Sequence, residues 1–458
     1  MAAATKIAVI GSGISGLTMA YWLTKKGYDV SVIEQSDHVG GSIVTENQDG
    51  FLIDLGPNST LETSETLKQL VRDLGIEDQK VYGSEKSNNR YVVRNGRLHA
   101  LPMSPMAFIK TRLFSTRAKF RLILEPFIKR TDGRDLPLSE FVKYRLGEEF
   151  LDYAINPFVA GVYAGDPAKL STATGFPKLY ALEQNYGSFI KGAIKGARER
   201  KKRDEVAKDR AKLFSFMEGM ETLTSALAKE LEGRIYRNCE VIDLVNENDT
   251  FKIKLNNAGQ SESRVYEKVV ISAPTFNMAE FMSMLTSEEI RTLQDVYYPP
   301  VDVIFMGFHK DDVNRKLDGF GFLVPKVENR QILGSIWSSS IFPNRAPEDH
   351  VAFTTFVGGT RQPENTSLND TELAELVYND LNGLVGLSGE PVITRIKRWP
   401  KAIPQYRMGY QKVQQMFDDL ENKIPGLYFS GNFRRGISVG DSVLSAEATL
   451  TKMLADLE

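Results

Sequence analysis

The chain has 458 residues, of which 42% are apolar and 25% charged, and its formal net charge is -2. This length exceeds one simple core, so we expect two or three domains. The near-zero charge predicts no nucleic-acid partner. The single cysteine, Cys239, excludes an internal disulfide and suits a reducing compartment. No long apolar run occurs and "MAAATK" leads straight into an apolar strand, so we expect a cytoplasmic protein of bacterial type.

The segment "IAVIGSGISGLTMAYWL", residues 7–23, predicts a buried strand, a tight glycine turn and a helix, in that order. Gly11 makes the turn, Gly13 lets the backbone approach a pyrophosphate, and Gly16 lets the helix pack closely on the strand. The helix N-terminus offers free N–H groups to phosphate oxygens. A second apolar strand ends at Glu34, whose carboxylate can accept bonds from both ribose hydroxyls and repels a 2′-phosphate. The pattern predicts a dinucleotide other than NADP; an incidental glycine-rich turn is the alternative.

The residues after this second strand distinguish FAD from NAD. Gly40 and Gly41 permit a second close approach of the backbone, and "DLGP", residues 54–57, closes a further turn. This arrangement resembles the extended FAD fingerprint of the flavin amine oxidase superfamily. Ser42 stands where that superfamily carries a basic residue, which removes one phosphate contact from the pattern. FAD is therefore the expected cofactor.

The C-terminal stretch "GLYFSGNFRRGISVGDSVLSAEATLTKML", residues 426–454, predicts a strand, a loop and a helix. In the superfamily the equivalent strand lies beside the first strand, and the helix N-terminus points at the flavin. Strands near 238–244 and 267–276, with a polar hairpin between them, are expected to form a small sheet that places Val241 near the adenine. Ordinary strand packing is the alternative for Val241.

The resemblance implies one set of FAD contacts along the whole chain. The expected residues are Gly11, Ser12, Gly13, Ile14, Ser15, Gly16, Glu34, Gln35, Gly40, Gly41, Ser42, Gly56, Pro57, Asn58, Ser59, Val241, Trp399, Gly431, Ile437, Ser438 and Val439. The expected fold class is α/β and α+β: a discontinuous Rossmann-like FAD-binding domain of the amine-oxidase type, with an inserted β-sheet substrate domain and an inserted α-helical membrane-associating domain. The FAD-binding segments are 1–77, 229–288 and 411–458, the substrate-domain segments are 78–88, 196–228 and 289–410, and the helical domain is 89–195.

Five stretches, four in the inserted regions and one in the last FAD-binding segment, resemble the protoporphyrinogen oxidase family, above all its plant-type and related bacterial members. They are "NRYVVRNGRLHALP" (89–102), "FLDYAINPFVAGVYAGDPAKLS" (150–171), "GSIWSSSIFPNRAP" (334–347), "RWPKAIPQYRMGY" (398–410) and "GISVGDS" (436–442). The most specific motif is "NPFVAGVYAGDP". The resemblance implies oxidation of protoporphyrinogen IX to protoporphyrin IX in haem biosynthesis, by hydride transfer to FAD, with molecular oxygen as the final acceptor.

The same resemblance assigns four residues to the substrate. Arg90 matches an arginine that binds a propionate, a role that suits the fork of a guanidinium; a surface arginine is the alternative. Trp337 stands where plant-type members stack a phenylalanine on a pyrrole ring, with core packing as the alternative. Gly161 matches a small residue that lets the substrate lie close to the flavin, although a structural glycine is equally consistent. Leu323 is expected on the opposite pocket wall.

The reaction requires no catalytic side chain, because the flavin carries out the chemistry. The four histidines, at positions 38, 99, 309 and 350, are not paired at metal-ligand spacing, and no C-x-x-C occurs. We therefore expect no metal.

Residues 104–130 combine apolar side chains with basic ones. The basic residues are Lys110, Arg112, Arg117, Lys119, Arg121, Lys129 and Arg130, opposed only by Glu125. Such a surface suits anionic lipid, so we expect a peripheral contact with the inner face of the cell membrane; a half-buried amphipathic helix pair is the alternative. The segment "KGARERKKRDEVAKDRAK", residues 195–212, mixes both charges and predicts an exposed helix or a mobile loop rather than a nucleic-acid site.

Three rival functions remain open at this point. The first is oxidation of coproporphyrinogen III, the four-propionate analogue, to coproporphyrin III. The second is a non-catalytic flavin-binding scaffold, against which the intact glycine turn argues. The third is a generic amine oxidase, which would need an aromatic cage and a lysine linked to the flavin through water. A homodimer is also left open.

Overall fold

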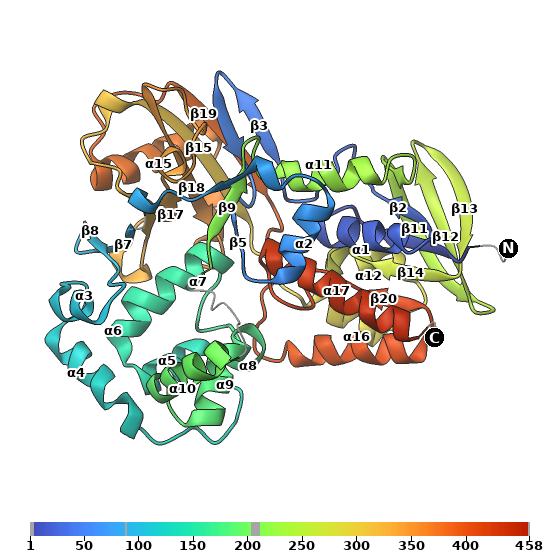
Figure 1. Cartoon of the computed structure of the whole chain (residues 1–458), viewed down its shortest axis with the longest axis horizontal. Coiled ribbons are helices and arrows are strands. Elements are labelled where there is room, and N and C mark those ends of the chain that lie inside the picture. The colour runs from blue at the N-terminus through green and yellow to red at the C-terminus, as the bar shows by residue number, and fades with distance from the viewer. Residues whose placement is uncertain (1–3, 88, 203–210, 457–458) are drawn as a thin grey trace.

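The computed structural model describes residues 4–87, 89–202 and 211–456. Figure 1 shows a parallel sheet with its helices at the right, a large mixed sheet at the upper left and a group of helices at the lower left. Residues 195–202 of the mixed-charge segment lie in helix α10 (Phe189–Lys202), and residues 203–210 lie outside the described residues.

The right-hand region is built on a five-stranded parallel sheet in the order β10, β2, β1, β14 and β20. The strands are β1 (Lys6–Ile10), β2 (Asp29–Ile33), β10 (Ile235–Tyr236), β14 (Lys268–Ile271) and β20 (Leu427–Phe429). The continuous apolar runs of β1 and β2 are buried because both faces of the sheet are covered, as is usual for parallel sheets.

Helices cover one face and a small sheet with further helices covers the other. The first face carries α1 (Ile14–Lys25), α2 (Glu65–Asp73), α11 (Glu221–Glu230) and α17 (Val439–Ala455). The second face carries the meander β11 (Cys239–Glu247), β12 (Thr250–Asn257) and β13 (Gln260–Tyr266), with α12 (Thr275–Phe281), α13 (Ser287–Gln294) and α16 (Gln411–Lys423).

Two details of this region differ from the sequence-based expectation. The predicted polar hairpin forms β12 and β13, so the small sheet has three strands, and the segment 268–271 joins the main sheet as β14. Strand β20 pairs with β14 rather than lying beside the first strand, because β14 pairs directly with β1. The order of parallel strands depends on long-range pairing, which the local pattern does not contain.

The upper-left region is a seven-stranded sheet in the order β19, β15, β18, β17, β16, β7 and β8. Its strands are β7 (Asn89–Arg94), β8 (Arg97–Ala100), β15 (Val301–His309), β16 (Gly319–Leu323), β17 (Ile332–Ile336), β18 (His350–Gly358) and β19 (Ile393–Trp399). Helix α15 (Asp370–Val385) begins at a capping box of Asn369 and Glu372 and packs Leu373, Val377 and Leu381 onto one face. The opposite face turns toward the helical region.

Smaller elements connect these layers. They are β3 (Thr45–Gln48), β4 (Phe51–Asp54), β5 (Thr60–Leu61), β6 (Lys80–Tyr82), β9 (Leu213–Phe216), α14 (Ser338–Ile341) and the short 3₁₀ turns Glu77–Gln79, Glu85–Ser87, Lys310–Asp312, Lys326–Glu328 and Pro363–Ser367.

The lower-left region consists of short helices with serine N-caps at residues 104, 115 and 171. In chain order they are α3 (Pro105–Lys110), α4 (Thr116–Leu124), η3 (Glu125–Phe127), α5 (Leu138–Arg145), α6 (Glu148–Phe150), the π-helical turn η4 (Leu151–Ile155), α7 (Asn156–Tyr163), α8 (Thr172–Gly175), α9 (Pro177–Tyr186) and α10.

The segment boundaries shift accordingly. Residues 89–100 form β7 and β8 of the large sheet, so the predicted start of the helical domain at residue 89 is too early and its helices begin at α3. Helix α11, predicted to lie in the substrate domain, packs against α1 of the cofactor-type sheet instead.

Candidate functional site

The first turn leaves space where a ligand phosphate is expected. Gly11 follows β1 with a φ of +100°, and a Cβ on Gly16 would lie 2.0 Å from the Gly11 carbonyl oxygen, so only glycine lets α1 pack this closely. At Gly13, by contrast, no other described atom lies within 4 Å of a Cβ position. Gly13 is also the N-cap of α1 without a side-chain bond, which leaves the first-turn N–H groups available to an anion.

The second glycine pair lies directly against this turn. The Gly40 N–H donates to the Ser12 carbonyl oxygen at 2.9 Å, and Gly13 and Gly40 form an isolated parallel bridge. A Cβ on Gly41 would lie 3.1 Å from the Gly13 Cα. The "DLGP" turn joins the same surface, because a Cβ on Gly56 would lie 1.8 Å from a Ser42 carbonyl oxygen. These turns are separate in sequence and contiguous in space.

Glu34 stands at the carboxyl end of β2, beside the turn. Its Oε2 accepts from the Ser12 N–H at 2.9 Å and the Ser12 hydroxyl at 2.7 Å, and its Oε1 accepts from the N–H and hydroxyl of Ser36, both at 2.9 Å. Serine hydroxyls rotate, so ribose hydroxyls can replace them on the carboxylate. The first residue of β11, Cys239, donates its N–H to the Glu34 carbonyl at 2.8 Å, which brings Val241 to this end of the sheet.

The C-terminal elements close the site. The Ser15 hydroxyl donates to the Ser442 carbonyl at 3.2 Å and joins the start of α1 to the start of α17. Ser438 caps α17 by accepting from the Asp441 N–H at 3.1 Å. The Trp399 indole N–H donates to the Leu55 carbonyl at 2.9 Å, next to the "DLGP" turn.

The other expected contacts lie on or beside these same turns. They are Ile14, Gln35, Pro57, Asn58, Ser59, Gly431, Ile437 and Val439. Most of the expected cofactor residues therefore gather at the carboxyl ends of the parallel strands, where ligands of open α/β sheets bind. The open space at Gly13, the uncapped start of α1 and the oriented carboxylate of Glu34 fit FAD, although their individual roles stay predictions.

Three of the four predicted substrate residues, Arg90, Gly161 and Leu323, lie on the face of the large sheet opposite α15. Helix α7 packs on β16 and β17, and a Cβ on Gly161 would lie 2.2 Å from the Leu323 Cδ2. The structure thus brings two of the predicted residues into contact, with the leucine occupying the space that the glycine leaves. Arg90 pairs in register with Gly321 on the adjacent strand, is exposed, and holds its guanidinium 5.7 Å from the Phe320 ring centroid.

Two apolar residues of α7 were not predicted. Phe158 and Val162 are 42% and 45% exposed, one helical turn apart. On a helix of 3.6 residues per turn they project between the face that carries Gly161 and the face packed into the helical region. Their spacing within the motif "NPFVAGVY" could have identified this stripe from the sequence. With Leu323 they form an apolar wall where α7 packs on the sheet face that also carries Arg90.

Trp337 does not lie at a pocket wall. Its side chain is fully buried in the core between the large sheet and α15, with its ring centroid 5.5 Å from that of Tyr91. The structure therefore places Trp337 in the core-packing role rather than in contact with a substrate. The motif resemblance identified the position but not the face of the sheet on which its side chain lies.

The last turn of α7 connects this wall to the predicted flavin end. Gln405 donates its side-chain N–H to the Tyr163 carbonyl at 2.7 Å. Burial raises the pKa of Tyr163 to about 12, and the nearby charge of Asp441 acts in the same direction. The Tyr163 hydroxyl is therefore neutral at physiological pH and lies close to the start of α17.

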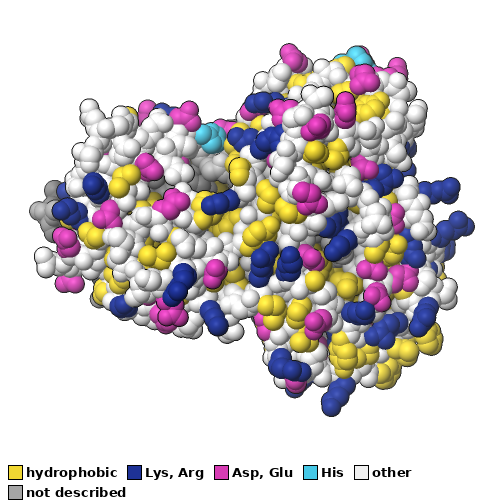
Figure 2. Space-filling model, turned by 180° about the vertical axis from the view of Figure 1, so that it is seen from behind, with side chains coloured by type: hydrophobic (Ala, Val, Ile, Leu, Met, Phe, Trp, Pro, Cys, Tyr) yellow, Lys and Arg dark blue, Asp and Glu magenta, His cyan; other side chains and the backbone are white. Residues whose placement is uncertain are grey.

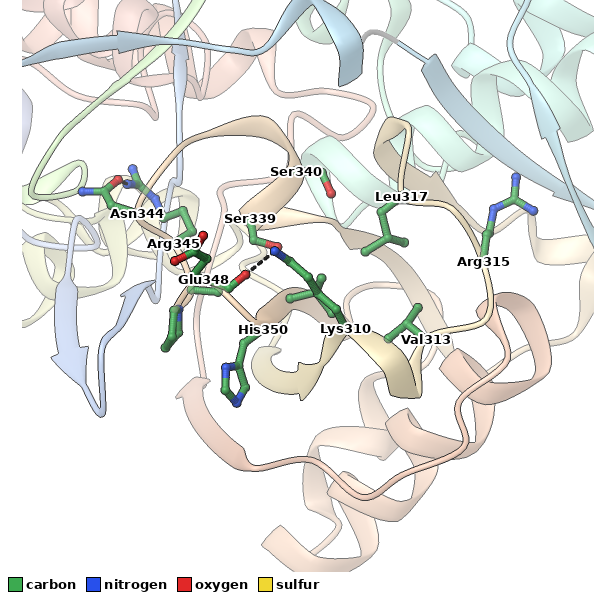
Figure 3. A pocket seen from close by; sticks show the side chains of 13 residues that line it. Lys310, Val313, Arg315, Leu317, Ser339, Ser340, Asn344, Arg345, Glu348 and His350 are labelled. Carbon is green, nitrogen blue, oxygen red and sulfur yellow. Dashed lines mark hydrogen bonds between the residues drawn. The ribbon is translucent and has the colours of Figure 1, made fainter.

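A separate cavity of about 460 Å³ lies where β15 ends and β18 begins, as Figure 3 shows. Its lining includes Lys310, Arg315, Leu317 and His350, and the Lys310 ammonium donates to the Glu348 carbonyl. None of the predicted site residues lines this cavity.

The model of the family of flavin-containing amine oxidoreductases matches residues 14–449. The chain belongs to this family. As a flavin-containing amine oxidoreductase it is an FAD-dependent oxidoreductase, which confirms the expected cofactor and the expected amine-oxidase type of α/β fold; the roles of the inserted domains stay predictions.

Relatives cover the chain from end to end. Protoporphyrinogen oxidase 2 of Arabidopsis thaliana, a chloroplastic/mitochondrial protein, is 34% identical over 99% of this chain and 94% of its own length. The coproporphyrinogen III oxidase of Bacillus subtilis is 28% identical over 98% of both chains. A crystal structure of an Exiguobacterium protein, provisionally named a protoporphyrinogen oxidase, shares the fold with a TM-score of 0.82 at 22% identity and 99% coverage of both chains.

Replacing Gly13 with valine tests whether the turn at Gly13 binds a phosphate. Gly13 has a φ of -66°, so valine fits the backbone, and its side chain would fill the open space that a pyrophosphate needs. We expect the purified Gly13→Val protein to fold and to lack flavin absorbance, measured with circular dichroism as the control for folding. A folded variant that retains flavin absorbance would contradict phosphate binding at this turn.

Proposed function

We propose that this chain oxidises a porphyrinogen to the corresponding porphyrin, with protoporphyrinogen IX as the preferred substrate and molecular oxygen as the final electron acceptor. The observation that carries the proposal is the placement of exposed Arg90 on the sheet face against which α7 packs with Gly161 on Leu323. A porphyrinogen is a large apolar macrocycle with propionates, and it needs such a combination of apolar surface and cation. The names of the full-length relatives support the same reaction class.

Bound FAD supplies the acceptor for a hydride from a methylene bridge of the macrocycle. The chain itself binds and orients the substrate. Arg90 forms no ion pair with a described residue, so its fork is available to a propionate. Phe158, Val162 and Leu323 contact the apolar ring of the substrate. Gly161 has no side chain, so α7 can pack closely on Leu323 of the sheet.

The single cation assigned to the wall, Arg90, favours the substrate with fewer propionates. Coproporphyrinogen III carries four propionates, whereas protoporphyrinogen IX carries two. Arg90 is the cation that we assign to the wall, while Arg361, near α7, has its guanidinium engaged by backbone carbonyls and by Asn156. Oxidation of coproporphyrinogen III is the second candidate, because the Bacillus subtilis relative with that name also matches over 98% of both chains.

Parallel assays with the two porphyrinogens test this proposal. Purified holoenzyme is incubated in air with each substrate, and porphyrin fluorescence is followed against an enzyme-free blank. We expect porphyrin to appear faster from protoporphyrinogen IX. Faster appearance from coproporphyrinogen III would favour the second candidate, and no excess over the blank with either substrate would overturn the reaction class.

Arg90→Ala tests the propionate contact. Loss of a charged hydrogen bond is expected to raise the KM about tenfold or more while FAD stays bound. The matched control is Arg97→Ala, which removes an exposed arginine from the other strand of the same hairpin. An unchanged KM in Arg90→Ala, or an equal change in the control, would remove Arg90 from the site.

We also propose that the helical region contacts a membrane. The apolar patch consists of Met103, Met106, Ile109, Phe120, Ile123, Leu124 and Phe127, each 45–83% exposed. Figure 2 shows hydrophobic side chains gathered at the lower right, with Lys and Arg side chains beside them. None of the seven basic residues of 104–130 forms an ion pair with a described carboxylate, although Lys119, Arg121 and Arg130 donate to backbone carbonyls. The net positive charge of this segment suits anionic lipid. Among the described helices, none is both long and apolar enough to cross a bilayer.

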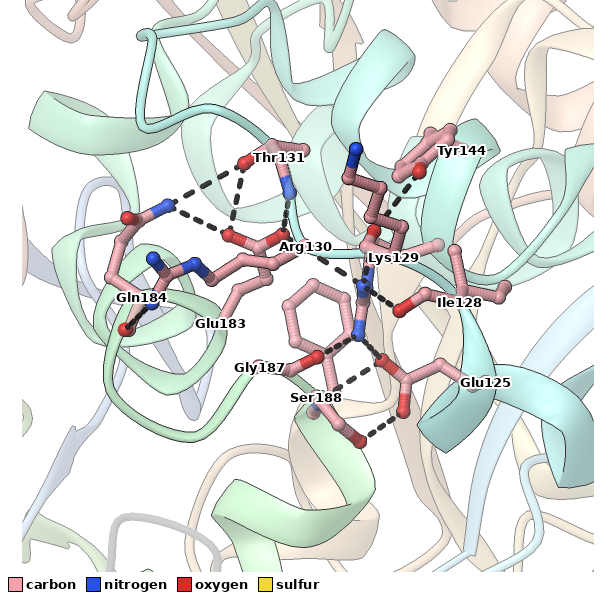
Figure 4. A network of polar contacts seen from close by, with 12 residues as sticks. Glu125, Ile128, Lys129, Arg130, Thr131, Tyr144, Glu183, Gln184, Gly187 and Ser188 are labelled. Atoms are coloured by element: carbon pink, nitrogen blue, oxygen red, sulfur yellow. Dashed lines mark hydrogen bonds and ion pairs between the residues drawn. The ribbon is translucent and has the colours of Figure 1, made fainter.

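A buried ionic network holds one end of this patch in place, as Figure 4 shows. Arg145 and Glu125 are fully buried and paired, and Arg145 also donates to the carbonyls of Ile128 and Lys129 at 3.1 and 3.2 Å. Burial alone would raise the pKa of Glu125, but bonds from Ser188, Phe189 and Arg145 outweigh it and lower the pKa. The segment that carries exposed Phe127 is therefore fixed to the helical core.

Phe127→Asp tests the membrane contact. Phe127 is 83% exposed, so the change is tolerated by the fold, and it replaces an inserting ring with a charge that anionic lipid repels. We expect binding to phosphatidylserine-containing vesicles to fall about tenfold in sedimentation assays. Val265→Asp, at a 55% exposed valine of the cofactor region, is the control. Equal loss in both variants, or none in Phe127→Asp, would contradict the assignment.

A further inference from the structure

Both ends of α7 are attached to one short segment that follows β18. The Thr360 N–H donates to the carbonyl of Ala164, just past the last turn of α7, at 2.7 Å. The next residue, Arg361, reaches the other end of the helix, where its Nη1 donates to the Asn156 Oδ1 at 3.3 Å. The eight residues of α7 span about 12 Å, so two neighbouring residues fix the helix along its whole length.

The same groups bind the hairpin that lies under the helix. Arg361 Nη1 donates to the Val324 carbonyl at 2.9 Å and Nη2 to the Ile332 carbonyl at 3.4 Å, at the end of β16 and the start of β17. The Asn156 Oδ1 also accepts from the Lys326 N–H at 2.8 Å. The two Nη atoms of a planar guanidinium can donate to all of these acceptors, whereas the single nitrogen of a lysine ammonium cannot reproduce that geometry.

Arg361 carries its charge in a largely desolvated position. Burial lowers its pKa to about 10, and the charge of Asp166 acts in the opposite direction. The guanidinium is therefore protonated at neutral pH, and carbonyl dipoles replace its water shell. Removing one acceptor would leave part of a buried cation unsatisfied, which is costly.

We propose that Asn156 and Arg361 are positioning residues that clamp α7 onto the β16–β17 hairpin. They would thereby set the width of a proposed substrate groove, defined as the space between the exposed side chains of α7 and the sheet face that carries Arg90. The contact of Gly161 with Leu323 lies between the two attached ends, and exposed Phe158 and Val162 move with the helix. A small tilt of α7 would therefore displace one wall of the groove relative to the other. The clamp rests on geometry alone, and its effect on substrate rests on the proposed function.

Matched variants at position 156 test the clamp. Asn156→Leu keeps the volume and removes the acceptor, while Asn156→Asp keeps the acceptor and adds an ion pair with Arg361. Arg361→Lys keeps the charge and removes the fork. Arg330→Lys is the control, because Arg330 pairs with Asp380 of α15 at 2.9 Å, on the other face of the sheet. All are prepared as holoenzymes with equal FAD content.

The first readout is hydrogen exchange of the amides of residues 158–163, which requires no substrate. We expect exchange about tenfold faster in Asn156→Leu and Arg361→Lys, and wild-type rates in Asn156→Asp and Arg330→Lys. Unchanged exchange of α7 in Asn156→Leu would overturn the clamp, as would uniform acceleration across the whole protein.

The second readout is the KM for the porphyrinogen that wild type oxidises. We expect Asn156→Leu to raise the KM about tenfold with a smaller change in kcat, and Asn156→Asp to restore it. Local acceleration of exchange with an unchanged KM would overturn the role in groove width. If wild type oxidises neither porphyrinogen, the proposed function fails while the exchange data still decide the clamp.

Discussion

The close contact between Gly16 of α1 and the carbonyl oxygen of Gly11 sets the geometry of the cofactor side. It fixes the angle at which α1 leaves β1, and so directs the uncapped helix start at the open space beside Gly13. The turn at Gly40 and the start of α17 then pack around that space. A larger side chain at Gly16 would tilt the helix and displace each of these partners at once.

Helix α7 contacts both the large sheet and the segment that leads into the cofactor region. At its last turn it is held by Gln405, in the segment that leads into α16, whose side chain binds the Tyr163 carbonyl. On the sheet side it lies with Gly161 against Leu323. Under the proposed function, a macrocycle that rests on this helix would be positioned by contacts from both of these sides.

The sequence allowed the local parts of the site to be predicted. The buried apolar run of β1, glycines with a positive φ such as Gly11 and Gly40, and the acidic end of β2 at Glu34 are all encoded within short segments. Long-range features could not be predicted in this way. The place of β14 beside β1 depends on pairing across more than half of the chain, and the burial of Trp337 depends on which face α15 covers.

The parallel sheet is assembled from segments that are far apart in the chain, and this has a consequence for biosynthesis. Ala8 of β1 pairs with Val269 of β14, and β20 and α17 come from the last 32 residues, 427–458. At ribosomal rates of about 5–20 residues per second, on the order of 20–90 s pass between the synthesis of β1 and the synthesis of β20 and α17. During translation the edge of β1 that pairs with β14 lacks its final neighbour, and such exposed edges favour aggregation. The proposed FAD site can therefore form in full only after β20 and α17 have been synthesised.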